Sequence, residues 1–129
     1  MSFDWSQFLR VAEDLAGQGT TPPSQEAKLR SSVSRSYYAA FCTARNHLRD
    51  TDGLMIPLDD AHKFVREEFK NSADTSRKQI GADLDRLRID RNKTDYSDMD
   101  LMAGLSGLPM TALLGLKLSQ QVISDIAAL

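Results

Sequence analysis

Apolar residues recur at steps of three and four along most of the chain, which is the period of an α-helix and not of a β-strand. The pattern predicts five helices that begin near residues 4, 24, 59, 73 and 110, the first four ending near residues 16, 49, 71 and 94. We therefore predict an all-α fold in a single domain over residues 1–129. The expected architecture is an antiparallel bundle of four main helices plus one short helix, the third.

Each predicted helix has an apolar face that we expect to be buried in the core. In the first two helices this face consists of Trp5, Phe8, Leu9, Ala12 and Leu15, and of Val33, Tyr37, Ala40, Phe41, Ala44 and Leu48. In the next two it consists of Ala61, Phe64, Val65 and Phe69, and of Ile80, Leu84 and Leu87. In the last helix the inner face is Leu114, Leu118, Val122 and Ile126, widened by Leu113, Leu116 and Ile123. So wide an apolar arc is typical of a central helix or of one that also contacts a partner.

Composition and charge narrow the class of protein. With 41% hydrophobic and 26% charged residues, the 129-residue chain has the composition of a globular domain. Its net charge of -2 gives no overall attraction to nucleic acid or membrane, so any basic surface must be local. The single cysteine, Cys42, excludes an internal disulfide and fits a reducing compartment, so we expect a cytoplasmic protein. The N-terminus lacks a signal-peptide pattern, and the uncharged stretch over residues 101–116 is too short for a membrane span.

Several kinds of chemistry lack their usual sequence motifs. Neither of the common glycine-rich phosphate loops is present, and the nucleophile elbow of the hydrolases is missing. Neither histidine, His47 or His62, has a second His or Cys at metal-ligand spacing. We therefore predict no metal site and no cofactor.

The stretch "SRSYYAAFCTAR", residues 34–45, combines aromatic and basic residues on the second helix. Its adjacent tyrosines place one ring toward the core and one, Tyr38, at the core's edge. With Arg35 and Arg45 nearby, this edge could stack a base and hold a phosphate. The alternative is that both tyrosines simply cover the margin of the core with amphipathic side chains.

Arg91 occupies the next position of the buried stripe of Leu84 and Leu87, so its stem should lie against the core. A guanidinium stays charged and is costly to bury without a partner. Asp95 lies four residues on, within reach along a helix, and Tyr96 adds a hydroxyl. The three residues could form a polar latch that fastens the fourth helix to the second. A positioned arginine could equally stabilise the charge of a phosphate.

Three segments together resemble the small stand-alone prokaryotic HEPN-domain proteins: "LRSSVSRSYYAAFCTARNHL", "AHKFVREEF" and "LDRLRIDRNKTDY". The likeness covers about residues 24–96 and depends on the order and spacing of the three motifs. It implies a helical bundle that forms a homodimer and has an RNA- or nucleotide-related role. Many proteins of this family are toxins that pair with a nucleotidyltransferase antitoxin.

Active members of the family are metal-independent ribonucleases with an R-x4–6-H motif. By position, the motif's arginine would be Arg91 and its polar neighbour Asn92. No histidine follows at the motif distance, and Asp95 and Tyr96 occupy that region. An imidazole can transfer protons near neutral pH, whereas an ionised aspartate is a poor acid and tyrosine rarely ionises there. In related toxins a tyrosine just beyond the motif is nucleotidylated, and Tyr96 would correspond to it.

These observations lead to three hypotheses. The first is a HEPN protein of little or no catalytic activity that binds RNA or nucleotide phosphate through Arg35, Tyr38, Arg45 and Arg91. The second is a metal-independent endoribonuclease toxin in which Asp95, Tyr96 or His62 replaces the missing histidine. The third is a dimeric interaction module that uses the apolar face of the last helix.

Overall fold

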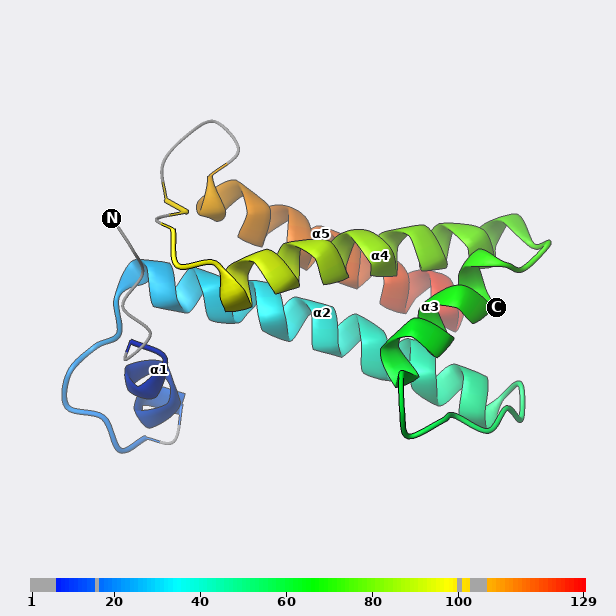
Figure 1. Ribbon diagram of the computed structural model, residues 1–129, viewed down its shortest axis with the longest axis horizontal. Helices are drawn as coiled ribbons and strands as arrows, with labels where there is room; N and C mark the ends of the chain where they lie inside the picture. Colours follow the sequence, from blue (N-terminus) through cyan, green and yellow to red (C-terminus); the bar gives the residue numbers. More distant parts are fainter. Residues whose placement is uncertain (1–6, 16, 100, 103–106) are drawn as a thin grey trace.

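The computed structural model describes residues 7–15, 17–99, 101–102 and 107–129, and side chains from residue 11 onward within these ranges (Figure 1). Five α-helices and no β-strand lie in this part of the chain: α1 (Gln7–Leu15), α2 (Gln25–Asp50), α3 (Ala61–Lys70), α4 (Thr75–Tyr96) and α5 (Leu108–Ala127). The all-α prediction is thereby confirmed, with most boundaries within two residues of those expected. Ser24 and Asp74 cap α2 and α4, their side chains accepting from the amides of Ala27 and Arg77.

The three long helices α2, α4 and α5 lie side by side, with α4 antiparallel to the other two (Figure 1). The shorter α3 packs at one end of this group, against α4 and α2. Among the described helices, α1 contacts only α2. The prediction of four main helices plus one short helix is thus corrected to three long and two short ones, because α1 has only 9 residues. None of the helices in the described ranges has the length and hydropathy needed to span a bilayer.

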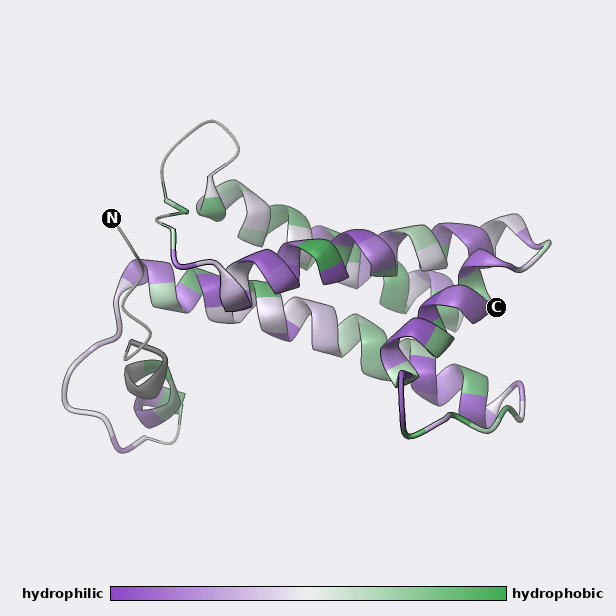
Figure 2. Cartoon of the chain, in the orientation of Figure 1, coloured by the Kyte–Doolittle hydropathy of each residue, from purple (hydrophilic) through white to green (hydrophobic). Residues whose placement is uncertain are grey.

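One apolar core joins α2, α3, α4 and α5. Hydrophilic and hydrophobic bands alternate along the long helices, as expected for helices with one buried face (Figure 2). The core contains every inner-face residue predicted for α2 except Val33, which belongs to a smaller buried cluster with Leu108 and Ala112. It also contains the predicted Val65, Phe69, Ile80, Leu84 and Leu87.

The inner face of α5 is the predicted one in its C-terminal half, where Val122 and Ile126 are buried and Leu118 packs against the core, but not in its N-terminal half. Leu114 is 45% exposed, and the buried face is Leu108, Ala112, Gly115, Ser119, Val122 and Ile126. These positions alternate in steps of four and three, which matches the 3.6 residues of a helical turn. The predicted face used steps of four only, and such a row moves gradually around the helix. The prediction favoured large apolar residues and therefore overlooked the small ones that let α5 approach α2. Leu113, Leu116 and Ile123 are exposed as well.

The predicted inner face of the first helix is not buried where the structure describes it. Ala12 is exposed and Leu15 is 60% exposed. The side chains of Trp5, Phe8 and Leu9 lie outside the described residues. Because α1 contacts a single helix, it covers only a small part of α2 and leaves a groove beside it.

Gly81 allows α4 to pass very close to the end of α3. A Cβ atom at this position would lie 2.6 Å from the backbone nitrogen of Lys70. That distance is far below van der Waals contact, so the two backbones can approach this closely only with glycine. The approach fixes the position of α3 relative to α4.

We predict that Gly81→Ala destabilises the protein by about 1–3 kcal/mol, because the clash is with backbone atoms that cannot rotate away. The matched control is Gly115→Ala in α5, where the added Cβ would lie 3.8 Å from the Cβ of Ser36, an ordinary contact. That variant should gain up to about 1 kcal/mol from the higher helix propensity of alanine. Urea unfolding of both variants measures the difference, and equal stabilities would contradict the close approach.

Candidate functional site

The end of α4, which carries most of the predicted site, is held by a buried arginine of α2. Arg30 has no exposed surface. Its Nη1 donates to the carbonyl oxygens of Thr94 and Ser97, at 2.9 and 2.7 Å, and its Nη2 donates to that of Met99 at 2.7 Å. Nε donates to Glu26 Oε2 at 3.2 Å, which supplies a countercharge. This one side chain therefore fixes where the last turn of α4 and the following residues lie against α2.

Sequence reasoning missed Arg30. Its spacing could have indicated that it is buried, because it lies three residues from both Ala27 and Val33 on the buried face of α2. A charged residue is normally assigned to the surface, so the predicted stripe begins only at Val33.

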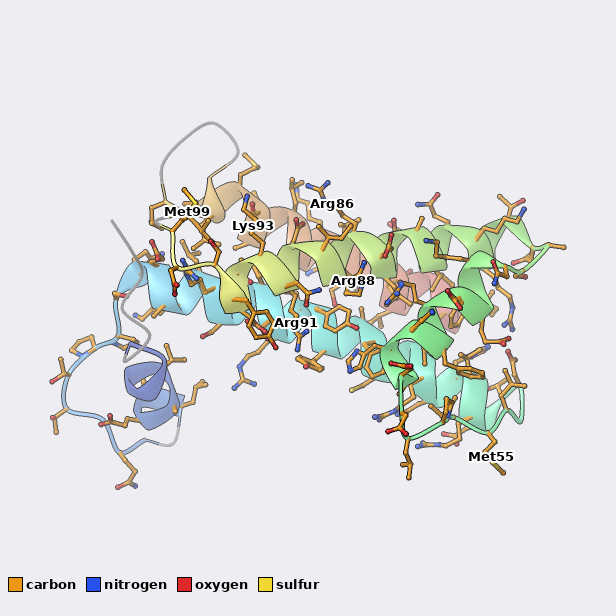
Figure 3. All side chains as sticks on the ribbon, in the orientation of Figure 1. Met55, Arg86, Arg88, Arg91, Lys93 and Met99 are labelled. Atoms are coloured by element: carbon orange, nitrogen blue, oxygen red, sulfur yellow. The ribbon has the colours of Figure 1, made fainter. Side chains whose placement is uncertain are left out.

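Arg91 lies one turn before the end of α4 and faces α2 (Figure 3). Its side chain is 18% exposed. Nη2 donates to the hydroxyl of Tyr38, and Nη1 donates to Asn92 Oδ1 at 2.9 Å. Nε lies 2.9 Å from Asp95 Oδ2, so the expected ion pair is present. The predicted latch between α4 and α2 is formed, but the hydroxyl that receives Arg91 is that of Tyr38 and not that of Tyr96.

Aromatic rings surround the guanidinium of Arg91. Its Cζ lies 5.2 Å from the ring centroid of Tyr38, 5.6 Å from that of Tyr37 and 5.9 Å from that of Tyr96. These distances are within the range of cation–π attraction. Tyr37 is buried, whereas Tyr38 is 38% and Tyr96 71% exposed. We call Arg91, Asp95, Tyr37, Tyr38 and Tyr96 the Arg91 cluster.

His62 joins this cluster from α3. Its ring stacks on that of Phe41, with centroids 4.0 Å apart, and its Nδ1 shares a hydrogen bond with the hydroxyl of Tyr37. Burial lowers the pKa of His62, and the positive charges of Arg91, Arg66 and Arg45 lower it further. Burial raises the pKa of Tyr37 to about 12, although Arg91 opposes the shift. Both rings are therefore uncharged at neutral pH.

Helical spacing alone could not have placed His62 here, because it is 29 positions before Arg91 and reaches the cluster through the packing of α3. The segment that carries it, "AHKFVREEF", is one of the three that resemble HEPN proteins. The second hypothesis named His62 as one substitute for the missing histidine. The structure places it beside Tyr37 and within the electrostatic influence of Arg91.

Two guanidinium nitrogens near the cluster lack acceptors. The Nε atoms of Arg88 and Arg91 are buried, and neither has a hydrogen-bond partner within the described ranges. The Nε of Arg91 is close to Asp95, but the N–H is not aligned with that carboxylate as a hydrogen bond requires. Arg88 does pair through Nη2 with Asp85 at 3.1 Å. Buried donors without acceptors are uncommon in folded proteins, and an anion or water would reach these two only after neighbouring side chains had moved.

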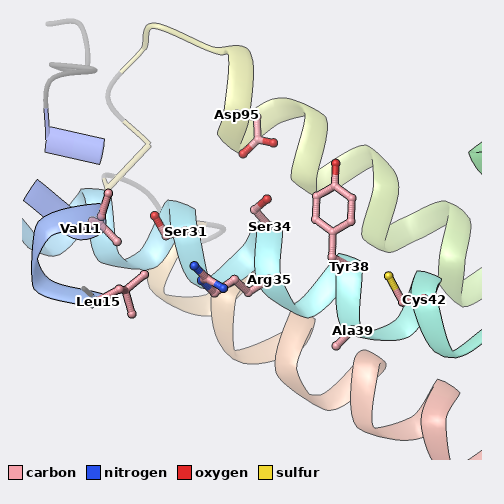
Figure 4. A pocket seen from close by; sticks show the side chains of 10 residues that line it. Val11, Leu15, Ser31, Ser34, Arg35, Tyr38, Ala39, Cys42 and Asp95 are labelled. Carbon is pink, nitrogen blue, oxygen red and sulfur yellow. The ribbon is translucent and has the colours of Figure 1, made fainter. Parts of the chain in front are cut away.

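Asp95 is the counterion of Arg91, and its carboxyl group is held by burial and by its polar neighbours. Burial raises the pKa of its carboxyl, while Arg91, a hydrogen bond with Ser34, and Arg30 act in the opposite direction. Ser34 and Asp95 face each other from α2 and α4 (Figure 4). The carboxylate thus lies beside the guanidinium where a ligand's anionic group would be expected.

The other predicted binding residues divide into two groups. Arg45 lies near the cluster, with its Cζ 5.9 Å from the ring of Phe41 and its charge acting on His62. Arg35 is exposed and makes no hydrogen bond or ion pair with the residues that the structure describes. It lines a separate groove between α1 and α2 (Figure 4). Cys42 packs against the core and also borders this groove.

Comparisons of the chain with protein-family models, curated proteins and solved structures find no match. In the part of the chain that the structure covers, no group of three or more His, Cys, Asp or Glu residues could hold a metal ion. The chemistry of the site is therefore inferred from its own arginines, aromatic rings and histidine.

We predict that His62 titrates below its ordinary pKa of 6.5 and that Arg91→Ala moves the midpoint upward, because one of the repelling charges is removed. Since the folded state resists protonation, stability should decline as the pH falls below 6.5, where the unfolded chain takes up a proton that the folded chain does not. Nuclear magnetic resonance of the imidazole protons measures the midpoint.

Arg86→Ala is the control for this titration, because Arg86 lies on the same helix but is exposed and paired with Asp90. It should leave the midpoint of His62 unchanged. A midpoint at or above 6.5 in the unmodified protein would contradict the described environment of His62.

Proposed function

We propose that this chain is a HEPN-like protein that binds a phosphate group of RNA or of a nucleotide at the Arg91 cluster. The observation that carries the proposal is the pair of buried Nε donors of Arg88 and Arg91 that lack acceptors among the described residues. Phosphate oxygens are strong acceptors for guanidinium donors. The resemblance of residues 24–96 to HEPN proteins supports the same assignment.

The surroundings of Arg91 suit an anion attached to a base. Arg45, Arg66 and Arg91 all act on His62, so a local positive field exists on a chain of net charge -2. The exposed rings of Tyr38 and Tyr96 flank the guanidinium and could stack an unpaired base. Uptake of a phosphate would require Asp95 to give up part of its contact with Arg91.

The partners that the resemblance implies belong to the same proposal: a homodimer and a nucleotidyltransferase antitoxin, in the cytoplasm. One structural feature supports a protein partner. Four large apolar residues in the first turns of α5 are 45–49% exposed, namely Met110, Leu113, Leu114 and Leu116. Such exposed apolar patches often mark interaction surfaces.

Arg91→Ala should weaken the binding of short fluorescent RNAs or nucleotides at least about tenfold, because it removes a charge-assisted contact. Asp95→Asn should strengthen binding, because it removes a competing charge and keeps the shape. Arg86→Ala, an exposed arginine on the same helix, should change affinity little. Fluorescence anisotropy on folded variants measures all three, and equal binding by Arg91→Ala and the unmodified protein would contradict the proposal.

A second candidate function is metal-independent RNA cleavage, and the position of His62 favours it. A neutral imidazole beside an arginine-held phosphate could take the proton of a ribose 2′-hydroxyl. The 2′-oxygen would attack the adjacent phosphorus and the 5′-oxygen would leave with a proton from solvent, giving a 2′,3′-cyclic phosphate. Asp95 is a poorer choice, because its carboxylate is already engaged with Arg91.

For this second function, the purified protein should cleave RNA in the presence of a chelator and lose the activity in His62→Ala. His47→Ala is the matched control, because the chain's other histidine lies near Asp52 and Arg77, outside the cluster. RNA left intact by the unmodified protein, or equal cleavage by the two variants, would rule out this role for His62.

A further inference from the structure

A groove runs between α1 and α2, and it borders the Arg91 cluster at Tyr38 and Asp95. It consists of two hollows of about 700 and 590 Å³ that share Val11, Leu15, Ser31, Arg35 and Ala39 (Figure 4). Either volume is within the range of small-molecule sites in proteins. Most of the shared wall is apolar. Asp95 also lines the larger hollow, and Asp14 and Lys28 line the smaller one.

The one cation common to both hollows is Arg35. Its guanidinium points from α2 toward α1, near Val11 and Leu15 (Figure 4). It has no hydrogen bond or ion pair with the residues in the described ranges, in contrast to Arg30 and Arg91, whose guanidiniums are engaged. The hydroxyl of Ser31 lies along the same wall and could add a hydrogen bond to an anionic group, whereas that of Ser34 is already bonded to Asp95.

We propose that this groove binds an amphipathic monoanion, a small molecule with an apolar body and a single carboxylate or phosphate head. The apolar body would lie along Val11, Leu15 and Ala39, and the head would pair with Arg35. A nucleotide fits less well, because Tyr38 at the margin is the only aromatic side chain among the described residues that line the two hollows. The head would pair with Arg35 and not with Arg91, so this proposal does not require phosphate binding at Arg91, although Tyr38 and Asp95 border both sites.

Cys42 provides a direct readout, because it lines the larger hollow and is the only cysteine in the chain. Its rate of reaction with a thiol reagent therefore reports on this groove alone. Decanoate should slow the reaction, and decanol, which has the same chain without the charge, should slow it much less. Comparing decanoate with decyl phosphate shows which head group the site prefers.

Arg35→Gln should weaken protection by decanoate about tenfold, measured relative to the variant's own unliganded rate, which corresponds to the loss of one charge-assisted hydrogen bond. Arg49→Gln is the control, because Arg49 is an exposed arginine of the same helix that is paired with Asp50. It should retain full protection.

Equal protection of Arg35→Gln, or equal protection by decanol, would overturn the assignment of Arg35 as the anion receptor. Absence of any protection would overturn the site itself, provided that methyl resonances of Val11 and Ala39 also remain unmoved by decanoate. The methyl resonances keep the test decisive if Cys42 reacts slowly in every sample.

Discussion

The fold depends on a buried guanidinium placed where a helix ends. The last carbonyls of a helix have no partners within it, and the negative end of the helix dipole attracts a cation. Arg30 meets both requirements at once, donating to the carbonyls of Thr94, Ser97 and Met99 while Glu26 balances its charge. Burying an arginine is tolerable only when its donors are so well used. The position of the C-terminal end of α4 against α2 follows from this contact.

The Arg91 cluster is built on that position. With the end of α4 fixed against α2, Arg91 lies one turn back and faces the two tyrosines of α2. His62 reaches the cluster from α3. The position of α3 against α4 depends on Gly81, because a Cβ atom at this residue would clash with the backbone of Lys70. Three helices thus meet at a point that holds several positive charges, an aromatic surface and an uncharged imidazole. Two arginines near the end of α4 have different partners. Arg30 donates mainly to backbone carbonyls, whereas Arg91 pairs with Asp95 and Tyr38, and its Nε makes no aligned hydrogen bond among the described residues.

The parts of the fold that could be predicted from the sequence are those in which large apolar residues recur at helical spacing. The buried faces of α2 and α4 are of this kind, as is the Arg91–Asp95 pair, which needs only helical spacing. The N-terminal half of the face of α5 was misplaced because Ala112, Gly115 and Ser119 carry little hydrophobic signal, although their smallness is what allows close packing, whereas Val122 and Ile126 were predicted correctly. Arg30 was missed because a charged residue is normally assigned to the surface, even though its spacing from Ala27 and Val33 places it on the buried face of α2. The approach of His62 to Tyr37 is a product of tertiary packing and has no local signature.

The most direct test of this account is hydrogen exchange on Arg30→Lys, which keeps the charge but loses the fork of donors that three carbonyls share. We predict a loss of about 3 kcal/mol in stability and selectively faster amide exchange over residues 93–99, with the middle of α4 still protected under native conditions. Unchanged exchange at the end of α4, or an increase spread evenly over all helices, would contradict the claim that Arg30 holds that end in place.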